Sequence, residues 1–403
     1  MDSIKDIFKI GVGPSSSHTM GPRRAAERFL AQYPQAARFQ VTLYGSLAAT
    51  GKGHLTDQAI LAILGASRTE ICWEPTVFLP FHPNGMRFRA LSEGGEELGA
   101  WEVYSIGGGF LSEGPGQTQV TEIAYPYTTM DGVLKWYGET GRLFWEYVLE
   151  YEGQPVFDHL RKVWRVMREA VERGLDAEGV LPGGLGLQRK ASAYYRRAEG
   201  LREGIRGRGF LFAYALAVSE ENAAGTGLIV TAPTCGSAGV LPAVLYYLYK
   251  HHDVPERRII RALATAGLIG AIVKENASIS GAEVGCQGEI GVACAMAAAA
   301  VNQIFGGSPN QIEYAAEMGL EHHLGLTCDP ICGLVQIPCI ERNAFAAARA
   351  MDANMYAGLS DGRHSISFDK VVRTMLETGH DLPSLYKETS TGGLAVAANF
   401  ARN

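Results

Sequence analysis

The sequence predicts an α+β protein in which a small N-terminal α/β domain precedes a larger all-helical domain. Segments rich in β-branched and aromatic residues, separated by turn residues, occur only before about residue 126. After that point apolar residues recur with helical periodicity, and stretches rich in Ala and Gly allow helices to approach closely. We therefore expect one domain over residues 1–126 and a second over 127–403, which agrees with two or three domains for 403 residues.

The elements follow in chain order. In the first domain, "GPRRAAERFLAQY" predicts a helix over 21–33, with Pro22 in its first turn. Strands are expected within 37–48 (ending in a glycine-containing loop), 69–79, 85–91 and 100–111. In the second domain the periodicity predicts helices within 132–152, 157–175, 207–224, 257–277, 291–305 and 309–325.

Composition and charge argue against two classes of partner. The formal net charge is −6 without a basic block, so nucleic-acid binding has little support. Two uncharged stretches, 222–249 and 290–312, contain Pro, Gly, Asn and Gln, and we interpret them as packed interior rather than membrane spans. The first residues, "MDSIKDIFKIGVG", lack the apolar core of a secretory signal, so we expect a cytoplasmic protein.

Seven cysteines are present, and in a cytoplasmic chain clustered thiols favour metal binding or catalysis over disulfides. Cys328 and Cys339 lie eleven residues apart on a segment rich in Pro and Gly, and Cys286 lies on a similar loop 42 residues before Cys328. Three thiolates converging on a [4Fe–4S] cluster would leave one iron position open. From spacing alone, buried reduced core cysteines remain the alternative. We expect a core position for Cys72, and either packing or a place next to the ligands, rather than ligation, for Cys235, Cys294 and Cys332.

Two loops carry candidate catalytic or binding residues. In "GVGPSSSHTMGP", Ser16, Ser17, His18 and Thr19 precede a helix N-terminus, which is a plausible carboxylate cradle. The alternative is a simple helix cap, which needs one hydroxyl. In "TGKGHLTD", His54 on a glycine-rich loop is a candidate general base, with a capping or surface role as the alternative.

Taken together, these stretches resemble the bacterial iron–sulfur L-serine dehydratases (L-serine ammonia-lyases) of the single-chain type. "GPSSSHTMGP" and "GKGHLTD" are similar to that family's small-domain motifs. "VTAPTCGSAGVLPAVL", "KENASISGAEVGCQGEIGVAC" and "GLTCDPICGLVQIPCIERNA" are similar to its catalytic-domain motifs, and "YKETSTGGLA" to its C-terminal motif. The match runs through nearly the whole chain in the family's order.

The resemblance implies an enzyme that converts L-serine to pyruvate and ammonia, acting as a homodimer. It implies a [4Fe–4S] cluster with one open iron position, held by Cys286, Cys328 and Cys339, and roles for His18 and His54 at the domain interface. The open position would act as a Lewis acid for the serine hydroxyl. We expect His54 to take the α-proton, and His18 to hold the carboxylate with further substrate contacts from Ser16, Ser17, Thr19 and Asn276.

Two departures from the family pattern bear on this interpretation. Family members often end with a cysteine shortly after the GGLA segment, whereas no cysteine follows Cys339 here. Cys235 and Cys332 stand where the family commonly has Asn and Gly, so substrate preference is open. The alternatives are a pyridoxal-phosphate enzyme, for which no glycine cup accompanies Lys274, a non-catalytic amino-acid sensor, and a structural zinc protein.

Overall fold

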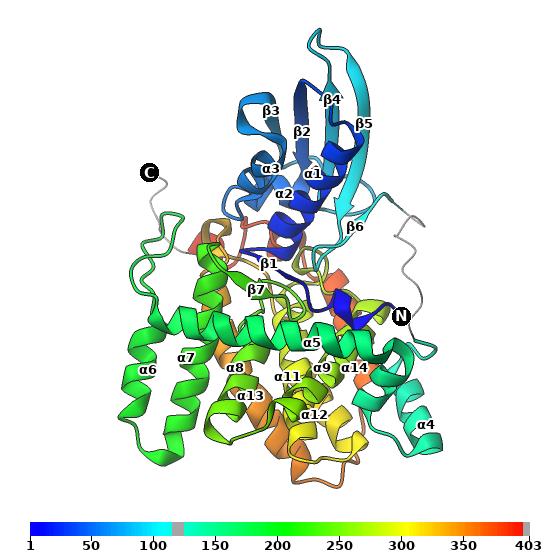
Figure 1. Ribbon diagram of the computed structural model, residues 1–403, viewed down its shortest axis with the longest axis vertical. Coiled ribbons are helices and arrows are strands. Elements are labelled where there is room, and N and C mark those ends of the chain that lie inside the picture. The colour runs from blue at the N-terminus through cyan, green and yellow to red at the C-terminus, as the bar shows by residue number, and fades with distance from the viewer. Residues whose placement is uncertain (115–124, 398–403) are drawn as a thin grey trace.

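The computed structural model describes residues 1–114 and 125–397, and Figure 1 shows its two parts. A small domain with a twisted sheet stands on a larger body of helices, and the chain's last segment, drawn in red, lies where the two parts meet. This arrangement confirms the predicted fold class. In the described part of the chain, no helix combines the length and apolar character needed to cross a bilayer.

The small domain is a five-stranded sheet with strand order β3-β2-β4-β5-β6. β2 and β3 are parallel, and the other neighbours are antiparallel. The strands are β2 (Arg38–Tyr44), β3 (Thr69–Glu74), β4 (Gly85–Leu91), β5 (Glu97–Ser105) and β6 (Leu111–Ser112), and the helices are α1 (Gly21–Gln32), α2 (Gly45–Thr50) and α3 (Thr56–Leu64).

Alternation along β2 explains how the sheet is covered. Phe39, Val41 and Leu43 are fully buried, whereas the residues between them are partly exposed. On the buried face Phe29 of α1 packs against Phe39 and Phe88, with ring centroids 6.1 and 5.3 Å apart. One face of the sheet is therefore closed by helices, and the loops at the end of β2 are free to reach the helical body.

The sequence predictions for this domain are mostly confirmed, with two corrections. The strand over 85–91 and the helix beginning at Gly21 are confirmed. The predicted strand over 69–79 is wrong beyond Glu74, because Pro75 cannot donate to a ladder hydrogen bond. The expected loop after β2 is wrong as well, since α2 begins directly at Gly45.

The helical body follows from residue 130. Its helices are α4 (Met130–Thr140), α5 (Phe144–Asp176), α6 (Ala191–Glu199), α7 (Glu203–Ala224), α8 (Val240–His251), α9 (Glu256–Asn276), α10 (Gly281–Val284), α11 (Ile290–Ile304), α12 (Pro309–Glu321), α13 (Cys339–Gly358), α14 (Phe368–Asp381) and α15 (Leu394–Ala397). The body also holds the short strand β7 (Leu228–Val230).

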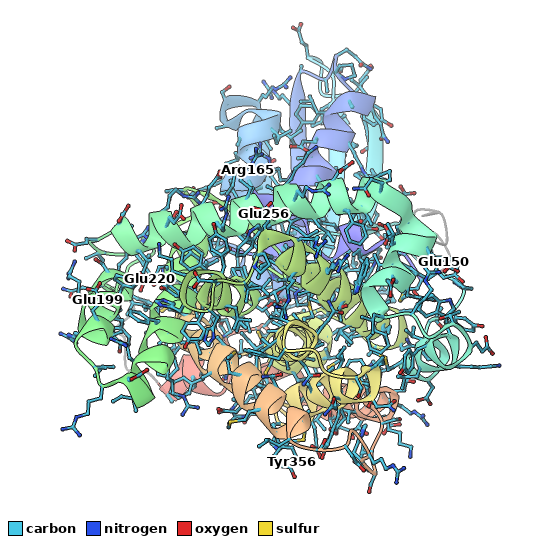
Figure 2. The ribbon with its side chains drawn as sticks, turned by 60° about the horizontal axis from the view of Figure 1, so that its bottom comes forward. Glu150, Arg165, Glu199, Glu220, Glu256 and Tyr356 are labelled. Atoms are coloured by element: carbon cyan, nitrogen blue, oxygen red, sulfur yellow. The ribbon has the colours of Figure 1, made fainter. Side chains whose placement is uncertain are left out.

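Helix α11 is the centre of this body. Its run from Ala293 to Val301 is fully buried, and α8, α9, α12 and α13 pack around it. Small side chains make this possible, because neighbouring backbones can approach an alanine-rich helix from all sides. Figure 2 shows the charged residues Glu150 and Glu199 at the outer rim, on α5 and α6.

The first residues of the chain pack on the helical body rather than on the sheet. Ile4, Ile7 and Phe8 belong to the helical core, and β1 (Ile10–Val12) pairs antiparallel with β7. The segment therefore crosses from the helical body into the small domain just before the serine loop. The division at residue 126 stays a prediction, and residues 115–124 beside it lie outside the described residues.

We expect Gly174→Ala to destabilise the fold, because α5 and α7 cross closely at this glycine. A Cβ atom at Gly174 would lie 2.3 Å from the carbonyl oxygen of Ala217, which is backbone and cannot rotate away. Relieving such overpacking costs about 1–3 kcal/mol, which lowers the melting temperature by several degrees.

Gly138→Ala on α4 is the matched control. A Cβ atom there meets nothing within 4 Å, so higher helix propensity should raise stability by about 0.5–1 kcal/mol. Thermal unfolding of both variants checks the pair. Equal melting temperatures would show that the crossing at Gly174 is not tight.

Candidate active site

The serine loop is a buried turn that leads into α1. Residues Ser16–Met20 form a single π-type helical turn, η2, and Ser15 caps it by accepting a hydrogen bond from the backbone N–H of His18. Ser16, Ser17, His18 and Thr19 are all buried. The alternative of a simple cap on the following helix does not hold, because α1 has Met20 at its N-cap without a side-chain hydrogen bond, whereas Ser15 caps η2.

The His54 loop is held against the serine loop by two reciprocal hydrogen bonds. The Thr19 hydroxyl donates to the carbonyl oxygen of His54 at 2.7 Å, and the Thr56 hydroxyl donates to the carbonyl oxygen of His18 at 2.6 Å. The two imidazole rings lie 4.5 Å apart between centroids. Two histidines separated by 36 positions in the sequence thus form one buried pair.

Hydrogen-bond donors and acceptors determine which nitrogen of His54 carries the proton. The Thr50 hydroxyl has a single proton and donates it to the carbonyl oxygen of Ser46. Its contact with His54 Nδ1, at 3.1 Å, therefore requires the histidine to donate. Nδ1 is protonated, and Nε2 carries the lone pair that can accept a proton.

The same argument from donors and acceptors assigns the tautomer of His18. The Ser46 hydroxyl donates to the carbonyl oxygen of Glu388 at 2.7 Å, so it accepts from His18 Nε2–H at 3.2 Å. His18 Nδ1 is then the acceptor, and the Ser17 hydroxyl lies 2.9 Å from it. Each ring is fixed in one tautomer by serine and threonine hydroxyls.

Both histidines are neutral at physiological pH. Burial lowers the pKa of His54 to about 3. The pKa of His18 is well below its ordinary value, because of burial and then because of the nearby His54 and His82. Neutral imidazoles can accept a proton, which an imidazolium cannot.

The C-terminal segment brings a carboxyl group to this pair. Residues Tyr386 to Glu388 pair with Cys328 through two 2.7 Å backbone hydrogen bonds, Cys328 N–H to Tyr386 and Glu388 N–H to Cys328. Glu388 Oε1 lies 3.4 Å from His18 Nδ1. Ligand atoms of His18, His54 and Glu388 all fall within 4.8 Å of one another, a spacing that could hold a metal ion.

The three candidate cysteine ligands come together next to this segment. Cys286 begins the turn η4 (Cys286–Gly288), Cys328 lies in the loop after α12, and Cys339 begins α13. Burial and then nearby charged groups, the other two cysteines among them, raise the pKa of the Cys328 thiol well above its ordinary value. Burial also raises the pKa of Cys286 to about 11. The prediction that three loops bring these thiols to one place agrees with this arrangement.

One cation and one carboxyl group border the thiols. Burial lowers the pKa of the Arg342 guanidinium, but the three neighbouring cysteines outweigh it and raise that pKa. Glu289 is half-buried, accepts a 2.7 Å hydrogen bond from the Thr234 hydroxyl, and lies near Arg342. The raised pKa values keep these thiols protonated. A bound cation would lower the pKa of the thiols and favour their thiolate forms.

Glycines leave room beside the thiols. A Cβ atom at Gly281 would lie 3.3 Å from Cys328 Sγ and 2.6 Å from a carboxylate oxygen of Glu289. Any side chain at 281 would therefore occupy the space next to the thiols. The donor set and this space both fit a thiolate-bound iron–sulfur cluster.

Among the described residues, polar atoms without a partner lie near His18 and where the two domains touch. His82 is close enough to His18 to lower its pKa, and among the described residues its Nε2 atom has no hydrogen-bond partner. Asn84 Oδ1, Ser105 Oγ and Ser280 Oγ also have no hydrogen-bond partner among the described residues, and all three residues are buried. Gly107 packs against Ser280, and Gly21 against Ser105. Buried polar atoms in this state favour a polar ligand that completes their hydrogen bonds.

Two of the predicted substrate-binding residues, Asn276 and Thr19, make other contacts. Asn276 is exposed at the C-terminal end of α9, and its amide donates to the carbonyl oxygens of Thr128 and Ile272. Within the described part of the chain, none of its hydrogen bonds reaches the histidines or the three thiols. The Thr19 hydroxyl donates its proton to the carbonyl oxygen of His54 and so joins the two loops.

Cys235 and Cys332, the two cysteines that depart from the family pattern, lie in different surroundings. Cys235 is buried, with its Sγ 3.3 Å from Met20 Sδ and its pKa raised by burial. Cys332 is exposed and has a left-handed backbone with φ of +54°, a conformation that explains a preference for glycine at this position. Neither thiol joins the group of three.

The fold and the site together define an enzyme with a buried polar centre between two parts of one chain. Comparison with models of protein families identifies the class of enzyme. The model described as serine dehydratase alpha chain matches residues 95–395, and the model described as serine dehydratase beta chain matches 3–72 and 63–115. The chain belongs to the serine dehydratase family, which confirms the resemblance and makes the protein a lyase.

Relatives named L-serine dehydratase support this family along the whole chain. The protein from Streptomyces coelicolor is 44% identical and that from Haemophilus influenzae 42% identical; the alignments cover 98% of this chain and 98% and 99% of those proteins. The Helicobacter pylori protein is 38% identical over 98% of both chains. These alignments are longer than the 403 residues of this chain, so they include positions that it lacks.

Proposed function

We propose that this enzyme is an L-serine ammonia-lyase, which converts L-serine to pyruvate and ammonia. The observation that carries the proposal is a neutral histidine, His54, with a ring nitrogen within 4.8 Å of ligand atoms of His18 and Glu388. The segment of Glu388 is hydrogen-bonded to Cys328, one of three neighbouring thiols. Removal of a weakly acidic α-proton needs a base, which His54 supplies, and loss of hydroxide needs an acid, which a metal held by the three thiols would supply. Relatives named for this activity support it.

We propose that Cys286, Cys328 and Cys339 hold a [4Fe–4S] cluster with one open position. When bound, the iron without a cysteine ligand supplies a Lewis acid for the substrate hydroxyl. The raised pKa values of these thiols and the space beside Gly281 support such a group. Arg342 then balances part of the thiolate charge.

In this proposal His54 is the base. Thr50 holds its Nδ1 proton, so Nε2 takes the α-proton of serine. A neutral base suits this step because it starts unprotonated. The imidazolium that forms keeps its Nδ1–H hydrogen bond to the Thr50 hydroxyl.

The remaining groups bind and orient the substrate. Ser16 and Ser17, next to His18, are the proposed partners of the carboxylate, and for Ser17 this contact uses the backbone N–H, because its hydroxyl proton is donated to His18 Nδ1. His82 and Asn84 offer unpaired polar atoms near the same pair. Burial excludes bulk water, so each of these contacts acts in a medium of low dielectric constant. The product of elimination is an enamine of pyruvate, which tautomerises to an imine and hydrolyses to pyruvate and ammonia once it meets water.

We further propose that the enzyme works as a cytoplasmic homodimer. Every cysteine among the described residues is a free thiol, as expected in a reducing compartment. Exposed apolar side chains near the end of α13, those of Met355, Tyr356 and Leu359, offer a surface for a second copy. Figure 2 shows Tyr356 pointing outward at the edge of the helical body.

The test is an anaerobic purification in which iron, sulfide and pyruvate formation from L-serine are measured on one sample. We expect about four irons per chain together with pyruvate and ammonia in equal amounts. Full iron without turnover would refute the lyase reaction with serine. Turnover in protein that contains no iron after anaerobic reconstitution would refute the cluster.

A further inference from the structure

We propose that the carboxyl group of Glu388 binds the α-ammonium group of the substrate, and so makes the site specific for amino acids. This assignment rests on the proposed function, because it takes L-serine as the substrate. Glu388 then touches the substrate without taking part in either bond cleavage.

The position of Glu388 fits this role. Its side chain is buried, and its ligand atoms lie within 4.8 Å of nitrogens of His18 and His54. In L-serine the ammonium group and the α-proton are attached to the same carbon atom. A base and an ammonium partner for this substrate must therefore lie close to each other, as His54 and Glu388 do.

In the part of the chain that the structure describes, Glu388 has no Lys or Arg partner. Among the described residues its one ion-pair contact is His18, at 3.4 Å. The serine hydroxyls fix His18 Nδ1 as an acceptor, so this ring presents no N–H to the carboxyl group. A buried carboxylate without a cation is costly, and a substrate ammonium group would supply the missing charge.

The neighbouring Glu289 already has a hydrogen-bond donor and a nearby cation within the protein. It accepts a hydrogen bond from Thr234 and lies near the guanidinium of Arg342. Of these two carboxyl groups, Glu388 is thus the one for which the described residues provide neither a cation nor a strong donor.

The backbone holds Glu388 firmly enough for a recognition role. Its N–H donates to the Cys328 carbonyl at 2.7 Å, and its own carbonyl oxygen accepts from the Ser46 hydroxyl at 2.7 Å. The residue has a left-handed backbone, with φ of +58°. These contacts tie the C-terminal segment both to the thiol loop and to the small domain.

The experiment compares two competitive inhibitors on the cluster-loaded enzyme. L-alanine keeps the ammonium group of serine, and L-lactate carries a hydroxyl in its place. We expect the wild-type enzyme to bind L-alanine more tightly. Glu388→Gln should reduce this preference about 10- to 100-fold, which is the range for one charge-assisted hydrogen bond, mainly through weaker binding of L-alanine.

Two further variants make the result specific. Glu388→Asp keeps the charge and should keep part of the preference for L-alanine. Glu377→Gln, an exposed substitution on α14, should leave both inhibition constants unchanged. An unchanged ratio of inhibition constants in Glu388→Gln would overturn the proposal.

Electron paramagnetic resonance of the reduced, substrate-free cluster tests the main competing role. We expect the same spectrum in the wild type and in Glu388→Gln. A changed spectrum without substrate would show that Glu388 is an iron ligand, and the proposal would be overturned. Absence of pyruvate formation by the wild type would instead contradict the proposed function, which separates the two failures.

Discussion

His54→Asn is expected to lower kcat for L-serine by about 10²- to 10⁴-fold, the usual contribution of a positioned general base. The variant loses the Nε2 lone pair while it keeps a side chain that can still bond to Thr50. The three thiols are contributed by other loops, so iron content and the visible absorbance of the cluster should stay at wild-type values. Steady-state kinetics and iron analysis on one preparation check both parts.

Thr50→Val is the matched test of how His54 is held. Valine keeps the shape of threonine and removes the oxygen that accepts from His54 Nδ1. We expect a smaller loss in kcat than in His54→Asn, because the base is present but its tautomer is no longer fixed. A His54→Asn enzyme with near-normal kcat would assign proton abstraction to another residue.

The pH profile gives a second measurement on the same residue. The pKa of buried His54 is lowered to about 3, so its neutral, proton-accepting form persists as the pH falls through 6.5. We therefore expect kcat/KM to show no loss of activity with the ordinary pKa of histidine. A clear acidic limb near pH 6.5 would contradict a buried neutral base.

Local sequence patterns were sufficient to predict the parts of the site that lie on short motifs. The serine loop precedes a helix, and the motif around His54 is a glycine-rich turn, so each could be recognised from neighbouring residues. Gly53 illustrates why glycine is needed there. A Cβ atom would lie 2.6 Å from the carbonyl oxygen of Gly333, so the turn must pack directly on the cysteine loop.

Residues that enter the site through long-range packing could not be predicted in this way. Glu388 meets Ser46 across 342 positions. The motif that contains it, "YKETSTGGLA", supports the resemblance to the family but does not indicate a role for the glutamate. His82 follows a predicted strand that ends early, and its unpaired nitrogen is visible only in the folded chain. Two signals were present, a histidine next to proline in "FHPNG" and an acidic residue in "YKETS", but neither has a spacing that indicates a role.

Asn276 shows the opposite case. It stands in "KENASIS", part of a motif that resembles the family, and this motif was the context of the predicted substrate contact. In the structure α9 ends at Asn276, and the turn that follows it carries Ser280 to the small domain instead. A helix end can separate neighbours in sequence by placing them on different sides of a turn, and hydrophobic periodicity does not say which side faces the site.

Cys328→Ala is expected to abolish both the cluster and the activity. Cys328 is the thiol that is tied by backbone hydrogen bonds to the segment carrying Glu388, so its loss removes a proposed iron ligand at the centre of the site. Changes in groups that merely support metal ligands already cost about 10- to 100-fold, and removal of a ligand should cost more. Iron and sulfide content after anaerobic reconstitution, measured with pyruvate formation, check this expectation.

Cys332→Ser is the matched control, because it alters a cysteine only four positions away. Cys332 is exposed, and its left-handed backbone is kept by serine at similar cost. Iron content and turnover should therefore match the wild type. If Cys328→Ala kept full iron, the thiols would not be the ligands, and His18, His54 and Glu388, whose ligand atoms lie within 4.8 Å, would be the metal-binding set. Loss of iron in Cys328→Ala but not in Cys332→Ser would assign the metal to the buried thiols, which leaves the histidine pair free for proton transfer.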